Sequence, residues 1–149
     1  MASLPAILEL WRKKLGRTLV RIEVVDHKDQ RYETAGDWFV DPSDGSISIR
    51  VSNTGSDADA ILIGVHELVE AVLCKAHGIG EEEVDEFDAA FNASNDLAEA
   101  EPGEDVAAPY FREHAAADIV ERFVALQMRV PWVEYSARVD SLFAKEEMK

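Results

Sequence analysis

The chain contains a single cysteine, Cys74, so no disulfide can form within it, which is typical of proteins in a reducing compartment. Long apolar runs are also missing. The longest, from Ala60 to Val65, is far shorter than the roughly 20 residues that cross a membrane, so the sequence predicts no membrane-embedded segment. The first residues carry no basic charge before their apolar positions, so we expect no signal peptide. We therefore expect a cytoplasmic protein.

Basic residues are scarce in the middle of the chain. Between residues 51 and 111 there are fifteen Asp and Glu against one Lys, and the formal net charge of the whole chain is −15. Such a field repels phosphates, so direct binding of nucleic acid is not expected, whereas cations and basic proteins are attracted. The alternative is that these carboxylates only keep the protein soluble.

The chain of 149 residues has the length of one domain, and we expect a single domain over residues 1–149. Alternating apolar residues and turn signals predict strands at 18–25, 38–40 and 46–51, the last two forming a hairpin. Helical periodicity and capping residues predict helices at 4–15, 57–77, 81–94, 109–130 and 132–143. Residues 95–109 read as a mobile acidic loop. The predicted fold class is α+β, with a small, mostly antiparallel sheet packed on a helical bundle.

The helix predicted at 57–77 is apolar on nearly all faces except at His66-Glu67-Leu68-Val69-Glu70. On a helical wheel Glu70 lies about 40° and Glu67 about 100° from His66, so the three polar groups share one face. Charged groups in an apolar setting need partners, and a divalent cation would satisfy all three. Side chains four residues apart on a helix can bind one ion. The alternative is a metal-free polar cluster satisfied by Arg or Tyr side chains.

The same segment resembles the active-site helix of zincin metallopeptidases, usually H-E-x-x-H, with Glu70 in place of the second histidine. The order of elements over residues 18–125 is similar too, since a hairpin whose edge strand can receive an extended substrate precedes the helix. The resemblance implies a zinc site that uses His66 and Glu70, with Glu67 as the general base. Together with Tyr110-Phe-Arg-Glu-His114, the helix also resembles small phage-associated proteins, which implies no function.

A site of this kind needs a third ligand, and the start of the helix predicted at 109–130 offers one. We expect it to be His114, which Asp118 follows four residues later, a spacing that resembles the ligand and orienting carboxylate of thermolysin-like zincins. Glu113 is the alternative, because it projects toward the apolar side of the predicted helix. Tyr110 is a candidate donor to an oxyanion, and Asp88 is a candidate partner of a metal-bound histidine.

Two functions stay open at this point. The first is a zinc-dependent hydrolase of minimal zincin type, acting on a peptide or protein substrate, with zinc or another divalent ion bound by His66, Glu70 and His114 and with water activated by Glu67. The second is a catalytically inactive acidic protein on a zincin-like scaffold, which binds a basic protein partner or mimics nucleic acid.

Overall fold

The computed structural model describes residues 16–94 and 100–144, and the helix predicted at 4–15 lies outside them. In this part of the chain the strands are β1 (Val20–Val25), β2 (Gly36–Val40) and β3 (Ile47–Ser52). The helices are α2 (Asp57–His77), α3 (Glu81–Ser94), α4 (Phe111–Gln127) and α5 (Trp132–Ser141), with short 3-10 helices η1 (His27–Asp29) and η2 (Pro102–Glu104). The predicted α+β class is confirmed.

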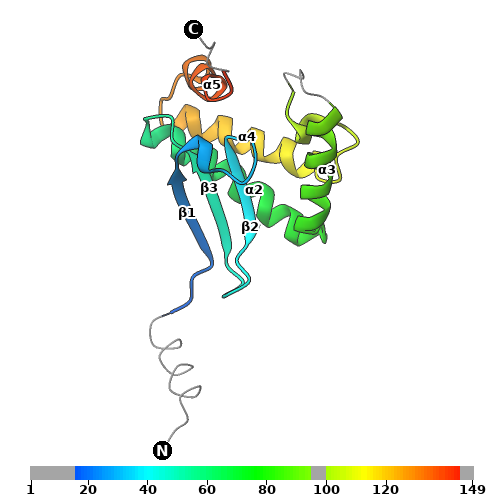
Figure 1. Cartoon of the computed structure of the whole chain (residues 1–149). Helices are drawn as coiled ribbons and strands as arrows, with labels where there is room; N and C mark the ends of the chain where they lie inside the picture. The colour runs from blue at the N-terminus through cyan, green and yellow to red at the C-terminus, as the bar shows by residue number, and fades with distance from the viewer. Residues whose placement is uncertain (1–15, 95–99, 145–149) are drawn as a thin grey trace, which may run out of the picture.

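The sheet is mixed, with the strand order β1-β3-β2 (Figure 1). The predicted hairpin is confirmed, since β2 pairs antiparallel with β3 and places Trp38 opposite Ile49. The prediction of a mostly antiparallel sheet is wrong, because β3 also pairs in parallel with β1. The segment between β1 and β2 carries the chain past one strand position, and β3 then fills that position. β2 is left at an edge of the sheet.

Helix α2 contacts the sheet on one side and α4 on the other, which explains why apolar residues occupy nearly all of its faces. As predicted, it begins after the N-cap Ser56, whose side chain accepts a backbone N–H of the first turn, and it ends at Gly78 in the left-handed conformation. Leu62 and Cys74 of α2 are fully buried. Even so, no helix in the described part of the chain is long and apolar enough to cross a membrane.

Helix α5 is joined to the start of α2 by an ion pair between Arg138 and the fully buried carboxylate of Asp59. Arg138 donates to the Asp59 carboxylate from Nε at 2.7 Å and from Nη2 at 2.8 Å, and Thr54 adds a third hydrogen bond at 2.8 Å. The hydrogen bonds from Arg138 hold the pKa of Asp59 below its ordinary value. This pairing fixes α5, so that its Tyr135 is buried and reaches α4.

The predicted mobile loop at 95–109 differs from what the structure shows. Residues 95–99 lie outside the described residues, but the part from residue 100 onward contains η2. A capping box between Glu101 and Glu104 forms this turn, and the Glu101 N–H donates to Glu104 Oε2 at 3.1 Å. Gly103 is buried against His114 of α4. The segment therefore packs on the domain and covers one side of the polar cluster described next.

Candidate metal centre

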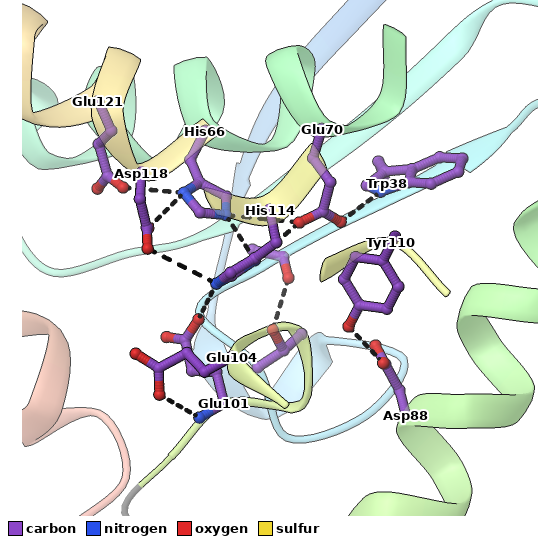
Figure 2. Close-up of polar contacts among 12 residues, drawn as sticks. Trp38, His66, Glu70, Asp88, Glu101, Glu104, Tyr110, His114, Asp118 and Glu121 are labelled. Atoms are coloured by element: carbon purple, nitrogen blue, oxygen red, sulfur yellow. Dashed lines mark hydrogen bonds and ion pairs between the residues drawn. The ribbon is translucent and has the colours of Figure 1, made fainter. Parts of the chain in front are cut away.

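Polar side chains from α2 and α4 meet in a buried cluster between the two helices (Figure 2). His66 and Glu70 lie one turn apart on α2, and His114 lies in the first turn of α4. Their exposed fractions are 7%, 6% and 5%. The packing of α2 on α4 thus brings together three residues that the sequence analysis predicted as metal ligands.

The nearest donor atoms of these residues form a small triangle. His114 Nδ1 lies 2.9 Å from Glu70 Oε2 and 3.3 Å from His66 Nε2, and the third side, from His66 Nε2 to Glu70 Oε2, measures 3.6 Å. Ligand atoms about 2.0–2.1 Å from a tetrahedral zinc ion are themselves about 3.3–3.4 Å apart. The donor set therefore fits zinc with only small movements of the side chains.

Neighbouring side chains hold the ligands in this orientation. Glu121 Oε2 accepts from His66 Nδ1 at 2.9 Å, which leaves His66 Nε2 facing the triangle. Tyr135 donates to the other oxygen of Glu121. In the same way, Trp38 Nε1 donates to Glu70 Oε1 at 2.9 Å and leaves Oε2 for the triangle. Supporting hydrogen bonds of this kind are typical of metal sites, where they fix the ligand atom and tune its basicity.

Asp118 offers another way to complete the site. Ligand atoms of His66, His114 and Asp118 lie within 4.8 Å of one another, and Asp118 Oδ1 is 3.4 Å from His66 Nδ1. That nitrogen, however, is closer to Glu121, and the Asp118 side chain is 39% exposed. We therefore favour Glu70 as the third ligand and place Asp118 outside the triangle.

One nitrogen of His114 is buried without a hydrogen-bond partner in the described part of the chain. This atom is Nε2, and the nearest acidic groups are Glu101 Oε2 at 3.6 Å and Asp118 Oδ2 at 3.9 Å. When Nδ1 of a histidine binds a cation, Nε2 carries the proton and needs an acceptor. Both carboxylates lie where a small movement supplies one, so the surroundings of His114 also fit a metal-bound imidazole.

Hydrogen bonds within the cluster favour the charged forms of His66 and Glu70 despite their burial. Burial lowers the pKa of His66, but hydrogen bonds to Glu121 and Glu70 outweigh it and leave the pKa well above its ordinary value. Burial raises the pKa of Glu70, but hydrogen bonds from His114 and His66 outweigh it and leave the pKa below its ordinary value. A proton on His66 Nε2 would point into the triangle, where a metal ion would bind, so protons and metal compete for this site.

This competition predicts how zinc stabilisation depends on pH. The raised pKa of His66 stabilises the metal-free fold fully below about pH 6.5, and the contribution is lost as pH rises through the raised value. The lowered pKa of Glu70 stabilises the fold above about pH 4.5, and this is lost only as pH falls through the lowered value. Zinc must displace the His66 proton, so the rise in melting temperature on adding zinc should grow from about pH 6 to about pH 8. Calorimetry across this range checks it; a rise independent of pH would contradict it.

Glu67, the predicted general base, lies on the side of α2 that faces the sheet. Its carboxylate packs on Gly36 of β2, where a Cβ atom would be only 2.5 Å from Glu67 Oε1. Burial raises the pKa of Glu67 well above its ordinary value, and the Glu70 carboxylate raises it further. Within residues 16–94 and 100–144, no hydrogen bond joins this carboxylate to another side chain.

The other candidates have different partners from those expected. Glu113, the alternative third ligand, is buried but points away from the triangle and accepts from His77 Nδ1 at 2.7 Å. The Tyr110 hydroxyl donates to Asp88 Oδ1 at 2.5 Å, and both side chains are buried. Tyr110 is therefore not free to stabilise an oxyanion, and the partner of Asp88 is a phenol rather than a histidine.

Two supporting residues were not assigned their role from the sequence. Glu121 lies seven residues after His114, on the same face of α4, and this spacing is a signal that could have revealed it. Trp38 is a different case, because no pattern in the sequence connects an indole of β2 with Glu70 of α2, 32 residues later.

Comparisons of the chain with protein-family models, with curated proteins and with solved structures find no match. The function of the cluster is therefore inferred from its geometry.

Proposed function

We propose that the chain binds one zinc ion, or another divalent metal ion, between α2 and α4, and that it is a hydrolase of minimal zincin type. The main support for the zinc site is the triangle of donor atoms from His66, Glu70 and His114, whose sides of 2.9, 3.3 and 3.6 Å suit tetrahedral zinc. Two histidines and one glutamate are an established catalytic zinc set. The α+β class and the hairpin before the motif helix support a zincin-like scaffold.

In this proposal Glu67 handles the proton. Zinc at the triangle would act as a Lewis acid that activates water and polarises the substrate carbonyl. Glu67 follows His66 directly on α2 and packs on Gly36 of β2. As general base it would accept a proton from the attacking water and pass it to the leaving amine. The upward direction of its pKa shift suits a carboxylate that first accepts a proton and then releases it.

The edge strand β2 supports peptide bonds as the substrate class. Just before β2 the Ala35 carbonyl accepts from the Ser52 N–H, and just after it the Asp41 N–H donates to the Ser46 carbonyl. Peptide groups along an antiparallel strand point alternately toward and away from the partner strand, so those of Trp38 point away from β3.

A peptide that pairs with this edge would use the Trp38 peptide groups, because the Gly36 carbonyl and the Val40 N–H already bond to Thr34 and Glu81. It would lie near Glu67, which packs on Gly36 of the same strand.

The exchange of Glu67 for glutamine tests the catalytic role. Glu67→Gln should keep one zinc per chain, because the side chain is not part of the triangle. Its melting temperature at neutral pH should not fall, because glutamine removes a buried carboxylate whose pKa is raised in the fold. Hydrolysis should fall by about 10²–10⁴-fold, the usual effect of a general base. The assay is cleavage of a mixed peptide library read by mass spectrometry, with Glu86→Gln on the exposed face of α3 as the charge-matched control. Equal turnover by Glu67→Gln and the parent would exclude Glu67 as the base.

The charge of −15 favours a second function, a catalytically inactive protein that binds a basic partner or mimics nucleic acid. Salt and chelators distinguish the two. Binding through an acidic surface weakens steeply as salt rises and survives chelation, whereas a zinc-dependent hydrolase loses its activity to chelators and recovers it with zinc.

A further inference from the structure

A groove of about 320 Å³ lies between α3 and the segment that leads into β2. This volume is at the lower end of the range of small-molecule pockets, about 300–1,000 Å³. Its lining residues are Arg31, Tyr32, Asp85, Asp88, Ala89 and Asn92.

Asp88 is the most deeply buried acidic residue of the groove, with an exposed fraction of 7%. Its Oδ1 accepts from the Tyr110 hydroxyl at 2.5 Å, and a phenol supplies no positive charge. Burial raises the pKa of Asp88 to about 6. A buried carboxylate with only a neutral partner gains most from a cation that reaches it.

The charge of the groove remains negative after its own cation is counted. Arg31 donates to both oxygens of the buried Asp37, at 2.6 and 2.9 Å, and only a longer contact of 3.3 Å reaches Asp85. Asp37 therefore neutralises Arg31. The carboxylates of Asp85 and Asp88 are left to set the sign of the field in the groove.

The groove also adjoins the candidate metal centre. Tyr110, which holds Asp88, contacts the ring of His114 with the centroids 6.2 Å apart. Tyr32, which also lines the groove, precedes Gly36 of β2 by four residues, and Gly36 contacts Glu67. The groove and the triangle are therefore connected through Asp88, Tyr110 and His114.

We propose that this groove binds a cationic side chain, a primary amine or a guanidinium, with Asp88 at its floor and Asp85 at its rim. The aliphatic part of such a side chain would lie against Tyr32 and Ala89, and its charged end would reach Asp88. The groove would give the hydrolase a preference for lysine or arginine next to the cleaved bond, and this role as a specificity pocket rests on the proposed function.

The test uses two probes that differ in one charged group. N-acetyl-lysine methylamide and N-acetyl-norleucine methylamide are titrated into the ¹⁵N-labelled full chain, and the amide signals of Tyr32 and Ala89 are followed by NMR. The lysine probe should give saturable shifts at both residues, and the norleucine probe should give none. Equal shifts with both probes would overturn the proposal, because an apolar side chain would then suffice.

Variants locate the charge that recognises the probe. Asp88→Asn should weaken binding of the lysine probe about tenfold and Asp85→Asn about threefold, while Glu86→Gln on the exposed face of α3 should leave it unchanged. If Asp88→Asn fails to fold, Asp85→Asn and Glu86→Gln still decide, because equal binding by these two contradicts the proposal.

Zinc content is measured on the same samples. If the parent chain binds the lysine probe but no zinc, the cation-binding groove is supported and the zinc-dependent hydrolase is contradicted. If it binds zinc but not the probe, the zinc site is supported and the cation-binding groove is contradicted.

Discussion

Replacing Glu70 with leucine is expected to abolish the rise in melting temperature that zinc causes, whereas replacing it with histidine should preserve the rise. Histidine at this position restores the full H-E-x-x-H pattern, and an imidazole one helical turn from His66 reaches the same ion. At a zinc concentration a thousand times the Kd, binding stabilises the fold by about 4 kcal/mol. For a chain of this size that raises the melting temperature by roughly 10 °C. Differential scanning calorimetry with and without zinc measures it.

The metal-free stabilities of these variants do not decide the question. Glu70 accepts from Trp38 Nε1 and from His114 Nδ1, so leucine removes the acceptor of two buried donors, and a neutral imidazole in Glu70→His can accept from only one of them. Each such donor costs about 1–3 kcal/mol. The zinc-dependent shift is therefore the readout. Uptake of one zinc per chain by Glu70→Leu, at unchanged affinity, would show that Glu70 is not a ligand.

Gly103→Ala is expected to weaken zinc binding by about 10–100-fold, although residue 103 contacts no metal. A Cβ atom on Gly103 would lie 2.5 Å from both Cγ and Nδ1 of His114, and 3.0 Å from its Cβ. These atoms lie at the start of the His114 side chain and have little room to move. The imidazole ring of His114 must therefore turn away from Glu70, or η2 must move away from α4. Either movement opens the triangle. Isothermal titration with zinc measures the loss.

Gly80→Ala is the matched control, because a Cβ atom at Gly80 has no neighbour within 4 Å. It makes the same chemical change at the turn between α2 and α3 and should bind zinc like the parent. Unchanged zinc affinity in Gly103→Ala would contradict the placement of His114 at the metal.

The sequence was most informative where local chemistry decides the structure. Helix α2 runs from Asp57 to His77 as predicted, because Ser56 and Gly78 are strong caps and act on their own neighbours. The sheet order was not predictable in the same way. Apolar alternation identifies a strand but carries no information about which strand lies beside it, so the parallel pairing of β1 with β3 went unforeseen.

The same distinction applies to the cluster. A helical wheel was enough to place His66 and Glu70 on one face, because both belong to α2. The choice between Glu113 and His114 needed the packing of α2 on α4, which turns His114 toward Glu70 and Glu113 toward His77. η2 was missed for a related reason: its few apolar residues give no period, and it is held by a capping box and by the contact of Gly103 with α4.

Elemental analysis of the purified chain tests the metal site most directly. The protein is prepared without a metal-chelating column, dialysed at neutral pH against buffer with trace zinc, and compared with His66→Ala and His114→Ala prepared in parallel. We predict about one zinc per chain in the parent and none in either variant, because each variant removes one corner of the triangle. A parent chain that is fully folded at neutral pH and takes up no divalent metal would contradict the proposed site.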